Sequence, residues 1–292
     1  MNTTPKTIQI YLPEGDPRGI RIAEITTRIV RVIEIPRSLL TQFQTMPEAQ
    51  QVGLYFLVGD SEDPDESSVY IGQSGAVGAR LAQHHKEKDF WNRALVVISL
   101  TNSLTQTHAL FLEWNSIREA QLANRYVVQN GTAGTKPHTP APLEADCLEI
   151  FATARTLLAT LGQPIFEPLA RPDEPSSSDE LFYCKTSKYD AVGQYTEEGF
   201  VVLKGSKARK DATPAMANTT VGKRRQAMIA DGALKLEGDF YIFQKDVLFK
   251  TPSGAGDAVT GASVNGWTLW KSKAGKTLDE LKRQNVATQA VV

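Results

Sequence analysis

The stretch Gly53-Leu54-Tyr55-Phe56-Leu57-Val58-Gly59 is apolar and short enough to be a buried strand, and Val69-Tyr70-Ile71-Gly72 is a second one. The acidic, turn-rich loop between them predicts a hairpin with a long connection. Because side chains alternate along a strand, we expect Tyr55 and Tyr70 on the same face of this hairpin. An ordinary aromatic pair across two strands is the alternative to a functional role.

A helix is predicted to follow from Gly75 to His85, with Ser74 as its N-cap. Arg80 and His84 are four residues apart, so they share one side of this helix. A guanidinium group can grip two phosphate oxygens, and an imidazole can move a proton near neutral pH. The alternative is an amphipathic helix whose arginine extends to water.

A second helix is expected from about His108 to Val128, with Thr105 as one of two possible caps. Its apolar stripe encloses Glu113 and consists of Leu110, Trp114 and Ile117. A buried carboxylate is costly unless it is paired, hydrogen-bonded or bound to a metal. An ion pair with Arg80 is therefore the alternative to a metal ligand.

These motifs form one ordered series, Gly53-Leu54-Tyr55, Tyr70-Ile71-Gly72, Gly78-x-Arg80-Leu81-x-x-His84, Glu113 and Asn130. The series resembles the GIY-YIG nucleases, with Leu54 in place of the usual isoleucine, a volume-conserving change. The resemblance implies an α/β (α+β) fold with a small three-stranded antiparallel sheet flanked by helices. Its third strand would be Ala94 to Ser99.

The resemblance also implies a metal-dependent endonuclease that hydrolyses nucleic-acid phosphodiester bonds, with Mg²⁺ or Mn²⁺ as cofactor. In that interpretation Glu113 holds the metal, and Arg80 stabilises the charge on the phosphoryl oxygens. Tyr70 or His84 is the base, and Tyr55 orients water or phosphate. The expected structural residues at the site are Gly53, Gly72 and Asn130. DNA is the expected substrate, while RNA and the form of the strand stay open.

Length and composition predict a soluble intracellular protein of one large or two modest domains. The 292 residues are 41% hydrophobic with a formal net charge of -1, so nucleic-acid binding must use a local patch. The two cysteines have no metal-site spacing, which favours a reducing environment. No signal pattern or bilayer-spanning run occurs, so we expect a cytoplasmic protein with no membrane partner. The sequence does not set an oligomeric state.

Four regions are expected. Residues 1–50 form a β-rich lead, which could extend the nuclease sheet or form a separate small one. Residues 51–162 form the nuclease domain, and 163–180 are a linker rich in proline and serine. Residues 181–292 form a second α+β domain.

The second domain contains the densest basic cluster of the chain, with Asp211 as the only acid between Val201 and Ala230. Its members are Lys204, Lys207, Arg209, Lys210, Lys223, Arg224 and Arg225. This part of the chain resembles an uncharacterised domain attached to GIY-YIG and restriction-type enzymes. We expect the cluster to bind nucleic acid. The alternatives are a solvated loop and a surface for a protein partner.

Two other functions are alternatives to a nuclease. The sequence from Ser253 to Asp257 resembles the Gly-Ala-Gly-Asp loop of ribokinase-like sugar kinases, but the alternating βα scaffold that such kinases need does not precede it. A nuclease-like scaffold that only binds DNA is the second alternative. The presence of both Arg80 and Glu113 argues against it.

Overall fold

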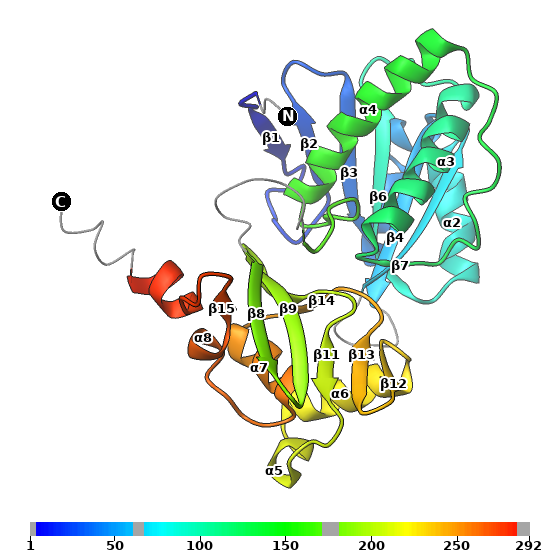
Figure 1. Cartoon of the computed structure of the whole chain (residues 1–292). Coiled ribbons are helices and arrows are strands. Elements are labelled where there is room, and N and C mark those ends of the chain that lie inside the picture. The colour runs from blue at the N-terminus through cyan, green and yellow to red at the C-terminus, as the bar shows by residue number, and fades with distance from the viewer. Residues whose placement is uncertain (1–3, 61–66, 171–180, 285–292) are drawn as a thin grey trace. The chain divides into compact units, whose positions relative to one another are not determined.

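The chain folds into two compact units, Met1–Pro168 and Leu169–Val292. The computed structural model describes residues 4–60, 67–170 and 181–284. Most of the predicted acidic loop after the first hairpin strand and most of the predicted linker lie outside these residues. Figure 1 shows each unit as a sheet with helices packed against it. This arrangement confirms the expected α+β fold class.

The first unit is built on a sheet that has seven strands among the described residues, in the order β1-β2-β3-β6-β4-β5-β7. All neighbours are antiparallel except β5 and β7. Its strands are β1 (Ile8–Tyr11), β2 (Arg21–Ile25), β3 (Val30–Pro36), β4 (Gly53–Asp60), β5 (Ser67–Ser74), β6 (Trp91–Ser99) and β7 (Val127–Val128). Its helices are α1 (Leu40–Gln44), α2 (Val77–Glu87), α3 (Gln106–Ala123) and α4 (Ala141–Thr160), with 3-10 turns η1 (Arg37–Leu39) and η2 (Pro47–Gln50).

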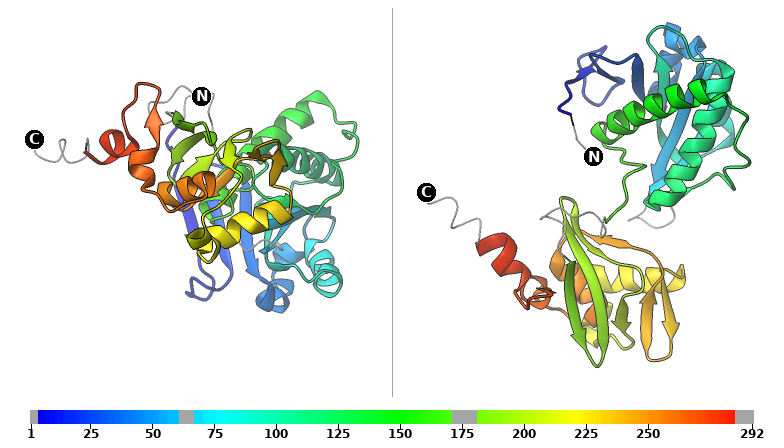
Figure 2. Two further views of the ribbon diagram at one scale, coloured as in Figure 1. Left: turned by 60° about the horizontal axis from the view of Figure 1, so that its bottom comes forward. Right: turned by 45° about the horizontal axis from the view of Figure 1, so that its top comes forward.

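Helices cover both faces of this sheet because both sets of alternating side chains are apolar. Leu54 and Phe56 of β4 belong to one core cluster, which also contains side chains of α3 and α4. Tyr55 and Leu57 belong to the opposite cluster, with side chains of α1 and α2. Tyr70 packs against this second cluster, so the predicted common face of the two tyrosines is confirmed. The two helices α3 and α4 lie side by side over one face in Figures 1 and 2.

The β-rich lead extends the sheet instead of forming a separate one. Strand β3 pairs with β6 along its whole length, from Val30 opposite Ser99 to Pro36 opposite Arg93. The predicted third strand is therefore the central strand β6, with β3 on one side and β4 on the other. The expected three-stranded core, β6-β4-β5, is therefore part of a larger sheet.

Two helix boundaries differ from the prediction. Helix α2 begins at Val77, and Ser74 does not cap it, because its hydroxyl bonds locally with the backbone of Ala76. Helix α3 ends at Ala123, where Asn124 takes a left-handed conformation (φ 49°), and the expected continuation becomes the short strand β7.

The predicted cap at Thr105 is confirmed as a capping box. Its side chain receives a backbone hydrogen bond from His108, whose imidazole accepts from the backbone N–H of Thr105. Leu110 is 41% exposed, so its predicted place in the apolar stripe of α3 is wrong.

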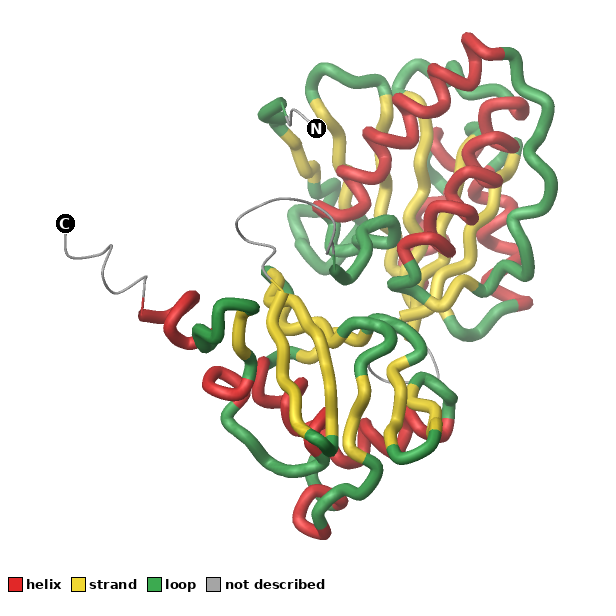
Figure 3. Tube along the Cα trace, in the orientation of Figure 1, coloured by secondary structure: helices red, strands yellow, loops and turns green. Residues whose placement is uncertain are grey.

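The second unit is a sheet with its main helices on one face, visible behind the strands in Figure 3. Its strands are β8 (Leu181–Thr186), β9 (Tyr189–Thr196), β10 (Gly199–Val202), β11 (Lys207–Arg209), β12 (Leu234–Glu237), β13 (Phe240–Phe243), β14 (Val247–Phe249) and β15 (Lys271–Ser272). Its helices are α5 (Pro214–Ala217), α6 (Thr220–Ala230), α7 (Pro252–Thr260) and α8 (Gly266–Leu269), followed by the π-helix η3 (Glu280–Gln284). Side chains of α6 and α7 share one core with those of the strands.

The start of the predicted linker belongs to the first unit. Ile165 and Phe166 are buried in the cluster beneath α3 and α4, and Glu167 forms an ion pair with Arg155 at 2.7 Å. The content of proline and serine predicted a linker from residue 163, but the first residues of that stretch form a short apolar segment that packs in the core of the first unit. Among the described residues, no helix has both the length and the apolar character needed to cross a bilayer.

Candidate active site

Tyr55, Arg80 and His84 form a hydrogen-bonded group between β4 and α2. The Tyr55 hydroxyl lies 2.8 Å from Nε2 of His84, and Nε of Arg80 donates to the same hydroxyl at 3.4 Å. Tyr55 and His84 are 1% and 2% exposed, whereas Arg80 is half-buried. Nη1 of Arg80 donates to Gln83, and Nη2 makes no hydrogen bond to a described residue. One edge of the guanidinium group is therefore still available to a ligand.

Burial keeps both rings of this group uncharged near neutral pH. It lowers the pKa of His84 to about 4, and the charges of Arg80 and Lys88 act in the same direction. Burial also raises the pKa of Tyr55 to about 12, against the hydrogen bond from Arg80. Since Arg80 donates to the phenol oxygen, the phenol proton goes to Nε2 of His84, and we assign the remaining imidazole proton to Nδ1. The nearest carboxylate to Nδ1 is Glu87, at 3.9 Å.

Tyr70 lies beside this group and reaches further toward solvent. Its ring centroid is 5.3 Å from that of His84 and 6.5 Å from that of Tyr55, and the side chain is half-buried. Nζ of Lys88 lies 4.3 Å from the Tyr70 ring centroid, a cation–π contact. Lys88 was not among the predicted site residues, although it follows His84 by four positions.

Polar side chains complete the free edge of β5. After the short pairing with β7 ends, Asn130 takes over the next backbone groups: its Oδ1 accepts from Ile71 N at 2.9 Å and its Nδ2 donates to Ile71 O at 2.8 Å. Two residues further, the backbone N–H of Gln73 lies close enough to the carboxylate of Glu113 to lower its pKa. Asn130 thus holds both backbone groups of Ile71 through its side-chain amide, while Glu113 on α3 lies near the end of β5.

Glu113 shares its neighbourhood with the other candidates. The charge of Glu113 raises the pKa of Tyr55, and the charge of Arg80 lowers the pKa of Glu113. Burial raises the pKa of Glu113, and the backbone N–H of Gln73 opposes this rise. The alternative of an ion pair is not observed, because within the described residues Glu113 contacts no arginine or lysine at ion-pair distance. All five candidate catalytic residues therefore gather at one place.

The donor set at Glu113 fits a divalent metal that arrives with a substrate. Carboxylate oxygens are preferred ligands of Mg²⁺, which keeps several waters and commonly uses one or two carboxylates plus substrate phosphates. The backbone N–H of Gln73 lies beside this carboxylate, which has several lone pairs to offer. No group of three or more His, Cys, Asp or Glu side chains in the described part of the chain could hold a metal by itself.

The two glycines expected at the site are required by close packing. A Cβ on Gly72 would lie 2.3 Å from the hydroxyl oxygen of Tyr55, which is its partner across the two strands. A Cβ on Gly53 would lie 2.7 Å from the carbonyl oxygen of Val97. Gly72 therefore provides the space in which the Tyr55 hydroxyl meets His84.

The basic cluster of the second unit does not form one surface. Lys207 and Arg209 alternate on β11 with Ala208, which points into the core beneath α6 and α7. Their side chains therefore lie on the outer face of the sheet, while Lys223 and Arg224 lie on α6, on the opposite side. The exposed members are Lys204, Lys207, Lys210 and Lys223, and the half-buried ones are Arg209 and Arg224.

Arg225 is a correction to the predicted nucleic-acid surface, because its side chain is only 2% exposed. Its Nε donates to Ala258 O at 3.1 Å, and its Nη2 donates to Arg209 O. In the sequence, Arg225 is the third of three consecutive basic residues. In the folded chain its side chain is buried, unlike that of Lys223.

The kinase-like segment lies in helix α7 instead of a loop. Thr251 caps this helix by accepting from Gly254 N at 3.0 Å, and Gly256 is buried. Oδ1 of Asp257 accepts from Val264 N at 2.7 Å. Glycine and alanine in this helix allow close packing.

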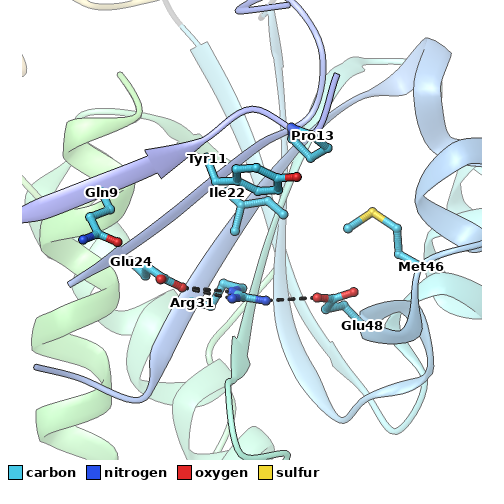
Figure 4. A pocket seen from close by; sticks show the side chains of 8 residues that line it. All are labelled: Gln9, Tyr11, Pro13, Ile22, Glu24, Arg31, Met46 and Glu48. Carbon is cyan, nitrogen blue, oxygen red and sulfur yellow. Dashed lines mark hydrogen bonds and ion pairs between the residues drawn. The ribbon is translucent and has the colours of Figure 1, made fainter. Parts of the chain in front are cut away.

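A separate hollow of about 430 Å³ lies on β1, β2 and β3 of the first unit (Figure 4). Its central charged residue, Arg31, is paired with Glu24 and Glu48, each at 3.0 Å. Tyr11 on its wall is 63% exposed. Because two carboxylates already neutralise the charge of Arg31, the lining of this hollow does not favour an anion.

One family model matches the chain. It is described as a domain of unknown function (DUF4357) and matches residues 182–282, so the second unit is similar to that family. No curated protein and no solved structure matches the chain. The family match lies outside residues 53–130, so the resemblance of the first unit to GIY-YIG nucleases stays a prediction.

Proposed function

We propose that the first unit is a metal-dependent endonuclease that hydrolyses phosphodiester bonds in nucleic acid, with DNA as the expected substrate. One observation carries the proposal: Tyr55, Tyr70, Arg80, His84 and Glu113 come from β4, β5, α2 and α3 and meet at the end of β5. A phosphoryl-transfer site needs a metal ligand, a cation for the phosphate charge and a group that accepts a proton. This cluster contains all three.

Arg80 is suited to the phosphate because Nε and Nη1 are held by Tyr55 and Gln83. These two contacts fix the plane of the guanidinium group and leave Nη2 to face the phosphate. A fixed donor loses little conformational freedom when charge develops in the transition state.

The geometry favours Tyr70 over His84 as the group that takes the proton from water. Nε2 of His84 is occupied by the Tyr55 hydroxyl, and its side chain is 2% exposed. The phenol of Tyr70 is half-buried and lies next to Lys88. In this proposal His84 positions Tyr55, and Tyr55 positions Arg80.

Glu113 is the proposed metal ligand, and the backbone N–H of Gln73 lies beside its carboxylate. When bound, Mg²⁺ or Mn²⁺ supplies Lewis acidity at the phosphate and the leaving oxygen. Because Glu113 is a single carboxylate, we expect weak metal affinity until a substrate phosphate adds its own oxygen ligands.

The second unit is proposed to supply affinity for nucleic acid through the outer face of its sheet. Lys207 and Arg209 point outward there, and Nζ of Lys207 lies 5.5 Å from the ring centroid of Phe240 on the neighbouring strand. Cations beside an accessible aromatic ring are typical of surfaces that bind single strands.

The test is a cleavage panel of duplex, single-stranded and branched DNA and of RNA, with Mg²⁺ or with a chelator. Glu113→Gln keeps the volume and removes the charge, so cleavage should fall by about 10³-fold or more while binding persists. Glu119→Gln, on the same helix, is the matched control and should cut normally. Full Mg²⁺-dependent cleavage by Glu113→Gln would contradict the proposed metal site.

A further inference from the structure

Arg225 is a buried cation with no carboxylate partner among the described residues. Its side chain is 2% exposed, and its two hydrogen bonds go to the backbone carbonyls of Ala258 and Arg209. Asp211 attracts it electrostatically but forms no ion pair with it. A buried charge that is matched only by neutral dipoles is costly, and a bound anion would compensate it.

This arginine forms part of the wall of a hollow of about 320 Å³ between α6 and the segment that follows β11. Its Nη1 makes no hydrogen bond to a described residue. Its Cζ lies 5.2 Å from the ring centroid of Tyr241, which also lines the hollow. The volume is at the lower end of the range for small-ligand sites. Lys210 adds a positive charge to the wall, and Thr213 and Gln226 add polar groups that can donate hydrogen bonds.

The hollow differs in charge from the one on the first unit. There, Arg31 is balanced by two carboxylates. Here, Arg225 and Lys210 face one acid, Asp211, which is exposed. The balance of charge on the wall is therefore positive.

We propose that this hollow binds a phosphate group of a nucleotide-sized ligand, with Arg225 and Lys210 as its charged contacts. A guanidinium group presents two parallel N–H donors that match phosphate oxygens, and the ammonium group adds a second cation. Thr213 and Gln226 can donate the remaining hydrogen bonds. The site lies in the second unit and does not depend on the proposed nuclease activity. A free nucleotide and a nucleic-acid strand end carry the same group.

Calorimetric titration of the full chain tests the proposal, with inorganic phosphate and adenosine 5′-monophosphate as probes and chloride at matched ionic strength as the blank. Gln226→Glu places a carboxylate on the wall at an exposed position, so the fold should persist while affinity falls by about tenfold or more. Ala227→Glu adds the same charge at the next exposed position, outside the wall, and should bind both probes nearly as the wild type does.

Arg225→Met removes the charged contact itself and should abolish the rise in melting temperature that the probes produce. Two oligothymidylates, one with and one without a 5′-phosphate, distinguish a strand end from a free nucleotide as the source of the phosphate. Tighter binding of the phosphorylated strand assigns a strand end, and binding of the mononucleotide without that difference assigns a free nucleotide. Absence of binding by every probe, or equal affinity of wild type and Gln226→Glu, would overturn the proposal.

Discussion

The buried imidazole of His84 should make the first unit sensitive to acid in a calculable way. In the folded chain the pKa of His84 is lowered to about 4, against 6.5 for an ordinary histidine. Between these pH values the unfolded chain carries more protons than the folded one, so stability is lost as the pH falls through this window. The free energy of unfolding lost through this shift of the His84 pKa is about 2 kcal/mol at pH 5 and about 3 kcal/mol near pH 4.

His84→Gln removes the titrating ring and keeps an acceptor for the Tyr55 hydroxyl. We expect the wild type to lose about 2 kcal/mol more than this variant when the pH falls from 7 to 5. Other titrating groups are common to both proteins and cancel in the comparison.

The measurement is urea unfolding followed by pulsed hydrogen exchange and mass spectrometry of peptides from β4 and β6, which separates the two units. The same experiment at pH 7 reports the cost of the substitution itself. Identical pH dependence in the two proteins would mean that the imidazole is solvated, and the assigned tautomer would then lose its basis.

Three further predictions concern the site and the nucleic-acid surface. Arg80→Lys keeps the charge but loses the planar fork, so single-turnover cleavage should slow by about 10²–10³-fold; a near-normal rate would place Arg80 outside the chemistry. Gly72→Ala would put a Cβ 2.3 Å from the Tyr55 hydroxyl oxygen and should lower the free energy of unfolding by about 1–3 kcal/mol, whereas an unchanged urea midpoint would show that the ring can shift. Lys207→Gln should flatten the salt dependence of DNA binding by about one unit of slope, with Lys223→Gln as the control that leaves it unchanged; the reverse pattern would assign the contact to α6.

Local patterns predicted the parts of the first unit that depend on short-range geometry. Alternation alone placed Tyr55 and Tyr70 on one face, because the two-residue period of a strand needs no knowledge of its neighbours. Helical spacing did the same for Arg80 and His84. The start of α2 was wrong by two residues because the Ser74 hydroxyl satisfies the nearby backbone of Ala76 without capping the helix.

Long-range packing decided what the sequence could not predict. The contact between Tyr55 and His84 spans two elements, and only the folded chain shows which atoms meet. Arg225 and Lys223 were both predicted to lie on the nucleic-acid surface, because composition does not show which basic residue of a run faces the core. The burial of Arg225 follows from the carbonyl groups that Ala258 and Arg209 present to it.

The way in which β5 is closed has a consequence for the solubility of the chain. An unpaired strand edge is a template on which a foreign strand can dock, and such docking starts aggregation. Asn130 occupies the backbone of Ile71, and the carboxylate of Glu113 lies beside the N–H of Gln73. A neighbouring chain would have to displace both side chains and approach a negative charge before it could pair there. The carboxylate proposed as a metal ligand would thus also disfavour strand pairing at this edge.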